Sequence, residues 1–326
     1  MTNLLSVQNL TKRFPAERRF LGKQKFVHAV NNVSFEVKKG ETFSIVGESG
    51  CGKSTVSRLI NHLIIPDTGD IWFEDTNIAA LNEDAFRPFR QHMQMIFQDP
   101  SASLDPRMRI EDLIAEPLLL FTQMSESERR KRVRESLELV GLSPRYAERY
   151  PHEVSGGQCQ RIGIARALLV NPKLIIADEP ISSLDVSIQA QILILLQQLQ
   201  KQFNLTYIFI SHNLSVVELI SDHVSVMYLG AIVETSSKKQ LYDRPFHPYT
   251  QALLSAVPIP DPKVKKKRIL LPGDLPSNVD LPQGCSFHTR CLYCQERCRQ
   301  EMPELREIEP DHYAACHYAG ELIKTA

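Results

Sequence analysis

The chain has 326 residues, of which 43% are hydrophobic and 23% are charged, and this composition is typical of a globular protein. Its 38 lysines and arginines balance 38 aspartates and glutamates, which argues against a dedicated nucleic-acid-binding protein, because such proteins usually carry a basic surplus. Since no apolar run could span a bilayer and the N-terminus lacks a secretory pattern, we expect a cytoplasmic protein of about two domains.

Strands and helices are predicted to alternate along most of the chain. The predicted strands are residues 4–10, 27–37, 42–46, 174–177, 206–210 and 224–227, and the predicted helices begin at Lys53, recur through 107–150 and span 186–203. This order indicates an α/β fold with a largely parallel sheet covered by helices. The charged segment 17–25 is predicted to be a loop, and the basic stretch 129–134 a solvated helix surface.

The character of the chain changes after residue 245. Prolines become frequent and a short basic run follows, so we interpret residues 258–284 as a linker that wraps over the protein. Five of the seven cysteines lie in residues 285–326, which we interpret as a small appendage held by a metal. The main α/β domain would then occupy residues 1–257.

Residues 47–54, Gly-Glu-Ser-Gly-Cys-Gly-Lys-Ser, match the phosphate-loop pattern, with a predicted strand before them and a helix after them. Glycines let backbone N–H groups turn inward around an anion, and the helix N-terminus adds positive potential. Lys53 is predicted to reach the β- and γ-phosphates, and Ser54 to bind Mg²⁺. The predicted nucleotide contacts of this loop are Gly47, Glu48, Ser49, Gly50, Cys51, Gly52, Lys53, Ser54 and Thr55, with Cys51 as a small filler.

A second motif supplies the acidic groups that this chemistry needs. Four apolar residues, 174–177, precede Asp178 and Glu179, so both carboxylates are expected at the C-terminal end of a central strand. Asp178 is predicted to hold the Mg²⁺ shell, and Glu179 to orient and deprotonate an attacking water.

Further markers occur between and beyond these motifs. The sequence Ser155-Gly156-Gly157-Gln158 lies between the phosphate loop and Asp178. Three further polar residues lie before and after it in the chain, namely Gln98, Asp185 and His212. Together these motifs resemble those of ATP-binding cassette (ABC) ATPases over roughly residues 4–257. The resemblance implies a phosphate-loop NTPase core with an antiparallel β subdomain and a helical subdomain at about residues 99–170.

The same resemblance assigns roles to the markers. Gln98 corresponds to the Q-loop glutamine that also approaches Mg²⁺, Asp185 to the D-loop, and His212 to the switch histidine that contacts the γ-phosphate. Phe14 corresponds to the aromatic residue that stacks on adenine, although it could instead be a core aromatic residue. In the family, ATP lies between Lys53 of one subunit and residues 155–157 of its partner, so ATP drives dimerisation.

Two segments narrow the branch of the family. Residues 98–107, Gln-Asp-Pro-Ser-Ala-Ser-Leu-Asp-Pro-Arg, and residues 247–254, His-Pro-Tyr-Thr-Gln-Ala-Leu-Leu, resemble the corresponding segments of peptide and nickel importers. Those importers also carry a C-terminal extension that ends in cysteines.

The terminal cysteines predict a metal centre, because a reducing cytosol disfavours a disulfide framework. Thiolates suit both a 4Fe–4S cluster and Zn²⁺, and the spacing alone does not choose between them. The resemblance favours 4Fe–4S, assigns Cys285, Cys291, Cys298 and Cys316 as ligands, and leaves Cys294 spare. From spacing alone Cys294 could belong to the set, and His288, His312 and His317 could be alternative ligands.

The resemblance therefore implies an ATPase subunit that powers import of di- or oligopeptides across a bacterial inner membrane. Nickel or another small solute is the alternative cargo. Its expected partners are a homologous ATPase subunit (identical or paralogous), two membrane permease subunits and, indirectly, an extracytoplasmic solute-binding protein. It is expected at the cytoplasmic face of the membrane, with no nucleic-acid partner. A soluble ATPase acting on ribosomes or DNA is disfavoured, because the chain has a single cassette and no coiled-coil insertion.

Overall fold

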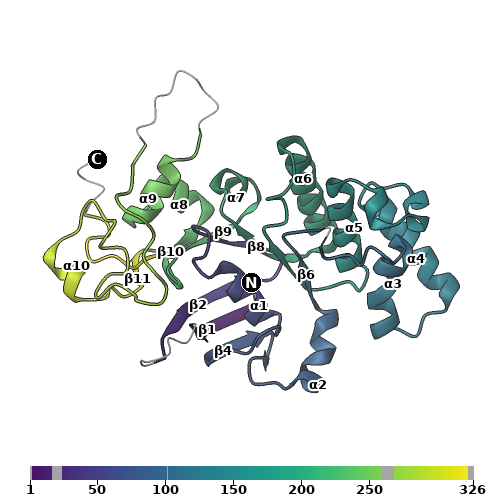
Figure 1. Cartoon of the computed structure of the whole chain (residues 1–326), viewed down its shortest axis with the longest axis horizontal. Helices are drawn as coiled ribbons and strands as arrows, with labels where there is room; N and C mark the ends of the chain where they lie inside the picture. Colours follow the sequence, from purple (N-terminus) through teal and green to yellow (C-terminus); the bar gives the residue numbers. More distant parts are fainter. Residues whose placement is uncertain (1, 17–23, 101, 259–267, 322–326) are drawn as a thin grey trace. The chain divides into compact units, whose positions relative to one another are not determined.

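We describe a computed structural model that covers residues 2–16, 24–100, 102–258 and 268–321 (Figure 1). The chain divides into two compact units. The middle unit contains Leu81–Ile210 with Lys38–Glu41, and the terminal unit combines Asn3–Val37, Thr42–Ala80 and Ser211–Ala326. The terminal unit therefore joins the beginning of the chain to its cysteine-rich end. Most of the loop predicted at 17–25 and part of the predicted linker lie outside the described residues.

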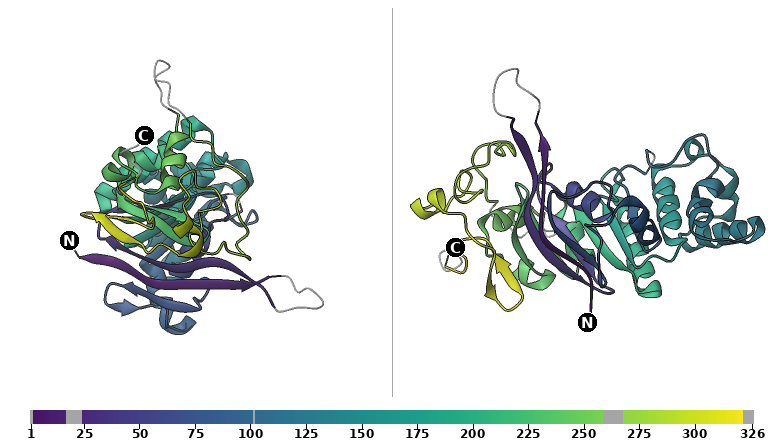
Figure 2. Two further views of the ribbon diagram at one scale, coloured as in Figure 1. Left: turned by 90° about the vertical axis from the view of Figure 1, so that its left-hand side faces the viewer. Right: turned by 90° about the horizontal axis from the view of Figure 1, so that it is seen from below.

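An antiparallel sheet forms the first part of the terminal unit. Its strand order is β2-β1-β4-β5, with bounds Phe26–Lys38, Asn3–Pro15, Thr68–Phe73 and Thr76–Asn77. In β2, buried Val33, Phe35 and Val37 alternate with exposed residues, which is the pattern of a strand with one face on a core. The two long strands β1 and β2 run beside each other in Figure 2. This sheet confirms the predicted antiparallel β subdomain.

A second group of strands in the terminal unit carries the phosphate loop. β3 pairs in parallel with β9, and β9, β10, β12 and β11 continue as antiparallel neighbours. The bounds are β3 Thr42–Val46, β9 His223–Tyr228, β10 Ala231–Ser237, β11 Arg306–Glu309 and β12 His312–Ala314. The helices of this unit are α1 Lys53–Ile60, α7 Leu214–Ile220, α8 Lys238–Asp243, α9 Pro248–Ser255 and α10 Glu296–Gln300. The C-terminal extension thus adds β12 and β11 to the strands of the cassette.

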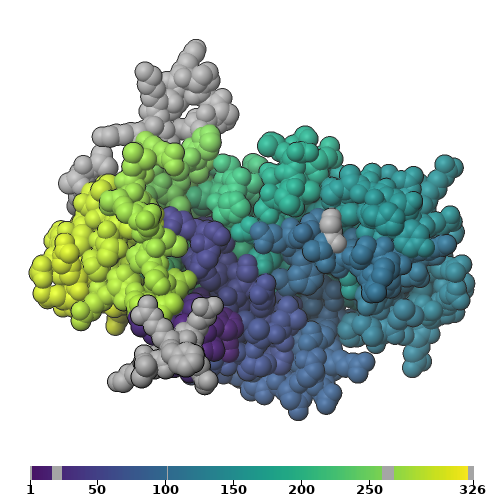
Figure 3. Space-filling model, viewed as in Figure 1, coloured from purple at the N-terminus to yellow at the C-terminus, as the bar shows by residue number. Residues whose placement is uncertain are grey.

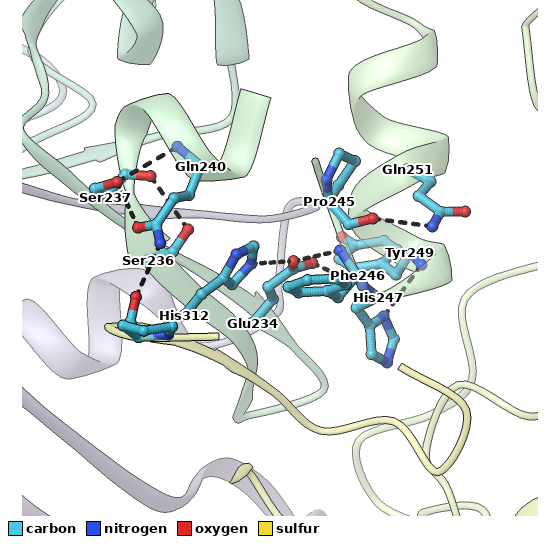
Figure 4. Close-up of polar contacts among 11 residues, drawn as sticks. Glu234, Ser236, Ser237, Gln240, Pro245, Phe246, His247, Tyr249, Gln251 and His312 are labelled. Atoms are coloured by element: carbon cyan, nitrogen blue, oxygen red, sulfur yellow. Dashed lines mark hydrogen bonds and ion pairs between the residues drawn. The ribbon is translucent and has the colours of Figure 1, made fainter. Parts of the chain in front are cut away.

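A buried carboxylate anchors this extension (Figure 4). Glu234 on β10 and His312 on β12 are both fully buried, and His312 Nε2 lies 2.7 Å from Glu234 Oε1. The backbone N–H groups of Phe246 and His247 donate to the same carboxylate over 2.6 and 2.9 Å. Because a buried carboxylate is costly unless it is well hydrogen-bonded, these three donors define a single arrangement of the segments they join.

Aromatic packing adds to this anchor. Phe287 of the extension is 1% exposed, and its ring centroid lies 5.2 Å from that of Tyr228 and 5.5 Å from that of Tyr249. Burying a phenylalanine side chain stabilises a fold by roughly 1.5–3 kcal/mol. In the space-filling view the extension lies against the N-terminal strands (Figure 3), where the N–H of His28 donates to the carbonyl of Asn278.

The middle unit combines three parallel strands with helices. β6 pairs with β7 and β7 with β8, and helices α3, α4 and α5 pack against one another (Figure 1). The bounds are α2 Glu83–Phe86, β6 Met93–Ile96, α3 Ile110–Phe121, α4 Glu126–Leu139, α5 Gly156–Leu168, β7 Leu174–Asp178, α6 Val186–Phe203 and β8 Thr206–Ser211, with 3₁₀ turns at Arg87–Gln91, Pro144–Glu148 and Pro151–Glu153. Within the described residues, no helix combines the length and apolarity needed to cross a membrane.

Candidate active site

The phosphate loop follows β3, whose five residues are all buried, and leads into α1. Gly47 and Gly52 are sterically required here. A Cβ on Gly47 would lie 2.2 Å from the carbonyl oxygen of Met227, and one on Gly52 would lie 2.0 Å from that of Ala29. Gly52 also has a φ of +107°, which side-chain-bearing residues rarely adopt. Both positions therefore need glycine, because any side chain there would collide with a neighbouring backbone carbonyl group.

Lys53 begins α1 and is 4% exposed. Its Nζ donates to the carbonyls of Gly47 and Glu48 over 2.9 and 3.0 Å, so the ammonium group lies inside the curve of the loop. The first turn of α1 has no acidic side chain, and Gly52 provides no side-chain cap. A buried cation beside the N-terminus of this helix favours an anion such as a phosphate group.

Cys51 is fully buried, so its small side chain fills space inside the loop, as the sequence predicted. Burial raises the pKa of its thiol, and nearby Lys53 opposes this shift. The thiol therefore stays neutral at physiological pH. Ser49 and Gly50 are exposed at the tip of the loop, while Ser54 and Thr55 are half-buried in the first turn of α1.

Three side chains from the end of the terminal unit hold this loop from outside, and sequence reasoning assigned none of them to it. The N–H of Glu48 donates to the hydroxyl of Tyr249 over 2.9 Å. Asn278 Nδ2 donates to the carbonyl of Gly50, also over 2.9 Å. Arg290 donates to both carboxylate oxygens of Glu48, over 3.2 and 2.9 Å. Tyr249 lay in residues 247–254, which the resemblance had singled out, whereas Asn278 lay in the predicted linker and Arg290 in the predicted appendage.

The acidic motif lies in the middle unit at the end of β7. All five residues of β7 are buried, and Asp178 is 5% exposed. Glu179 has a φ of +47°, and its N–H donates to the carbonyl of Ile210 over 3.0 Å. A left-handed conformation in a residue other than glycine is strained, and such strain is often found at functional sites.

Gln98 and Glu179 are brought into direct contact although 81 residues separate them. Gln98 Nε2 donates to Glu179 Oε2 over 3.0 Å. Gln98 is exposed, just beyond the end of β6, which is the parallel neighbour of β7. The pairing of these strands therefore explains why the two predicted site residues meet.

The signature sequence forms the N-terminus of α5. The N–H of Ser155 donates to Gln158 Oε1 over 2.9 Å, and the N–H of Gln158 donates back to Ser155 Oγ, which is a capping box. Ser155 and Gly156 are exposed. A Cβ on Gly157 would lie 2.7 Å from Ile188 Cγ2, so glycine allows close packing against α6. The arrangement presents a helix N-terminus at the surface of the middle unit.

The other predicted residues occupy separate places. Asp185 is exposed at the N-terminus of α6, and His212 is exposed directly after β8. Phe14 is half-buried on β1, with the ammonium group of Lys12 5.6 Å from its ring centroid. Lys53 and His212 belong to the terminal unit, whereas Gln98, Asp178, Glu179 and the signature belong to the middle unit.

The four cysteines that the resemblance selected line one small cavity in the terminal unit. The cavity is lined by Cys285, Cys291, Cys298 and Cys316, with His288, His317 and aromatic side chains around them, whereas Cys294 is absent from its lining. Burial raises the pKa of Cys285 to about 11 and that of Cys291 to about 12, and the neighbouring thiols reinforce both shifts.

The predicted metal site finds no support in the spacing of the side chains. No group of three or more histidine, cysteine, aspartate or glutamate side chains in the described part of the chain is close enough to hold one metal ion. Of the histidines considered as ligands, His312 is bound to Glu234 instead. The structure thus shows that the four thiols line one cavity, and their binding of a metal stays a prediction.

Comparison with known proteins shows which family has this sequence and fold. The family described as ABC transporter matches residues 30–182, and the family described as Oligopeptide/dipeptide transporter, C-terminal region, matches residues 233–298. A dimeric structure of the ATP-binding cassette MJ0796 in a post-hydrolysis state bound to ADP and Pi is 30% identical, with a TM-score of 0.65, and covers 72% of this chain and 98% of that chain. The fold and the motifs together define an ABC-type ATPase.

Full-length relatives identify the branch. The oligopeptide transport ATP-binding protein AppF of Bacillus subtilis is 52% identical, over 96% of this chain and 97% of its own length. The di/tripeptide transport ATP-binding protein DppF of Pseudomonas aeruginosa is 46% identical, over 99% of this chain and 100% of its own length. The chain therefore belongs to the family of ATP-binding subunits of oligopeptide and dipeptide ABC transporters.

The contact between Gln98 and Glu179 generates a prediction. Glu179→Gln keeps the size of the side chain and its hydrogen bond to Gln98, but an amide cannot take a proton from water. We expect ATP binding to persist while hydrolysis falls by about 10²-fold or more. ATPase assay and fluorescent-nucleotide titration of the purified protein, together with its homologous subunit if that is required, measure the two quantities. Glu138→Gln, on the exposed face of α4, is the matched control. Near-normal hydrolysis by the Glu179 variant would contradict its role as the base.

Proposed function

We propose that this chain is the ATP-hydrolysing subunit of a peptide importer in a bacterial inner membrane. The observation that carries the proposal is the combination, in one chain, of a phosphate loop built for an anion and a C-terminal region of the oligopeptide/dipeptide type. Relatives that match nearly the whole chain are named for oligopeptide and di/tripeptide transport. Peptides are therefore favoured over nickel or another small solute as the cargo.

The proposed roles in hydrolysis follow from the sequence motifs to which the residues belong. Lys53, enclosed by the phosphate loop, stabilises the β- and γ-phosphate charge. Ser54 and Asp178 would hold Mg²⁺ with help from Gln98, and Glu179 would activate the attacking water. His212 contacts the γ-phosphate, and Phe14 offers a ring to adenine.

The working unit is proposed to be a dimer with a homologous ATPase subunit. The exposed N-terminus of α5 suits this arrangement, because Ser155 and Gly156 can face a nucleotide bound to the partner. Asp185 lies at the exposed start of α6, next to Val186, which is 82% exposed. Loss of the γ-phosphate on hydrolysis would let the dimer open.

Two permease subunits are the proposed membrane partners, and the chain would sit at the cytoplasmic face. In the middle unit, the end of α3 exposes Leu119 and Leu120 to 57% and 59%, and Phe97 beside Gln98 is 46% exposed. Exposed apolar side chains of this size commonly mark a protein interface. A solute-binding protein outside the membrane would deliver the peptide to the permease.

The cysteine cavity is proposed to hold a 4Fe–4S cluster. Four thiols line it together with three histidines, and no carboxylate is among the described residues of its lining, which suits iron–sulfur chemistry and also zinc. A cluster binds each thiolate through a different iron, so it needs sulfurs spread around a space, whereas zinc needs them to meet at one point. The resemblance to importers whose extension ends in cysteines favours the cluster. When bound, the cluster would join segments that few apolar contacts hold together.

Removing the phosphate-loop cation tests the ATPase proposal. We expect Lys53→Ala to lower ATP hydrolysis by about 10²-fold or more, because the charge that develops on the γ-phosphate loses its stabilising cation. Cells that carry this variant should fail to take up labelled di- and oligopeptides. Lys201→Ala, exposed at the end of α6, serves as the control. Normal turnover at this site would overturn the assignment, and loss of nickel uptake with normal peptide uptake would overturn the cargo.

Metal analysis tests the cavity. We expect anaerobically purified protein to be brown, with absorbance near ~400 nm and about four irons per chain. Cys285→Ser, Cys291→Ser, Cys298→Ser and Cys316→Ser should each bleach the colour, whereas Cys294→Ser, outside the cavity lining, should not. One zinc per chain without iron would contradict the cluster, and absence of any metal under strict anaerobiosis would contradict the whole metal proposal.

A further inference from the structure

The ion pair between Arg290 and Glu48 connects the cysteine-rich extension to the phosphate loop. The two residues are 242 positions apart in the chain, yet the guanidinium Nη1 lies 2.9 Å from Glu48 Oε2. The side chains are 10% and 27% exposed, so the pair is largely shielded from water. Both residues lie in the terminal unit, so the contact is internal to one compact body.

The position of Glu48 makes this pair relevant to nucleotide binding. Glu48 directly follows Gly47, and its carbonyl accepts the Lys53 ammonium group. Its carboxylate therefore carries a negative charge on the loop that would hold the negatively charged phosphates of ATP. In a partly dehydrated site, like charges at short range repel strongly. Without a partner, Glu48 would oppose binding of the phosphates.

We propose that Arg290 is a positioning residue of the nucleotide site, which neutralises Glu48 and so allows the phosphate loop to accept a triphosphate. This inference rests on the proposed nucleotide site. Arg290 lies on the short loop between Cys285 and Cys291, whose thiols line the cysteine cavity. The extension thereby contributes directly to ATP affinity, in addition to its part in the fold.

The proposal makes an asymmetric prediction for the two partners. Arg290→Met leaves Glu48 charged and alone, and should raise the dissociation constant for Mg²⁺-ATP by roughly five- to ten-fold. Glu48→Gln removes the repulsion itself and leaves the cation of Arg290 in place, so it should bind Mg²⁺-ATP more tightly than the wild type. The double variant Arg290→Met/Glu48→Gln should return to within about two-fold of the wild type, since neither charge remains.

A purely structural role for the ion pair would give a different pattern. If the contact only fixed the shape of the loop, either single substitution would break it, and the double variant would be at least as weak as each single variant. Ionic strength adds a second readout. The defect of Arg290→Met should shrink in high salt, because salt screens the repulsion between Glu48 and the phosphates.

Titration of the full-length chain with a fluorescent ATP analogue and Mg²⁺ measures these affinities at low and high salt. Arg290→Lys should keep most of the affinity, because the cation is retained, and Arg297→Met should match the wild type, since Arg297 pairs with Glu301 at the surface of the same extension. If Arg290→Met does not fold, as judged by its thermal melt, Arg290→Gln takes its place.

The outcomes separate this inference from the proposed nucleotide site. Lys53→Ala is measured in the same series for both affinity and hydrolysis. If it leaves both unchanged, the proposed site is wrong. If Lys53→Ala abolishes hydrolysis while Arg290→Met binds nucleotide like the wild type, the proposed role of Arg290 is wrong. The same holds if the double variant Arg290→Met/Glu48→Gln binds nucleotide as weakly as Arg290→Met.

Discussion

The buried carboxylate of Glu234 is the contact on which the terminal unit depends. A charged group with no exposure is stable in a fold only when donors surround it, and Glu234 has three of them from two different parts of the chain. The N–H groups of Phe246 and His247 fix the entry into α9, and His312 fixes β12 (Figure 4). One side chain thus determines where the chain goes after the last strand of the cassette.

Both segments that Glu234 fixes, α9 and β12, are connected to the phosphate loop. α9 carries Tyr249, whose hydroxyl accepts the N–H of Glu48. The extension that β12 attaches to the sheet also includes Arg290, which pairs with the carboxylate of Glu48. The glycines of the loop make its tight turn possible, but glycine also loses more conformational freedom on folding than any other residue. Contacts from the extension offset that loss by holding a flexible loop in one conformation.

The sequence predicted the parts of this structure that depend on local patterns. The buried strand at 42–46 and the helix at 186–203 have the observed bounds, because continuous apolar runs and helical periodicity report burial directly. Lys53, Asp178 and the signature lie in fixed motifs, so their local settings were predictable. The contact between Gln98 and Glu179 was not predicted, because it depends on β6, for which the sequence predicted no strand, lying beside β7.

Other parts depend on partners that are distant in the chain. β11 and β12 are only four and three residues long, and β11 is largely polar. β12 exists as a strand because β10 provides an edge to pair with, and β11 pairs in turn with β12. The ion pair of Arg290 with Glu48 has no local signal, because an arginine beside a cysteine is equally compatible with an exposed loop. The buried role of Glu234 was hidden for the same reason, since a single glutamate in a strand usually faces water.

Hydrogen exchange of Glu234→Gln compared with the wild type tests most directly whether this carboxylate holds the extension and, through it, the phosphate loop. The substitution keeps the shape of the side chain but removes the charge and one acceptor for its three donors. We expect faster exchange at the amides of Phe246 and His247, in residues 285–298 and in the phosphate loop at 47–52, with β6 in the middle unit unchanged. Unchanged exchange at residues 47–52 and 285–298 in a variant whose Phe246 and His247 amides exchange faster would contradict this view of Glu234.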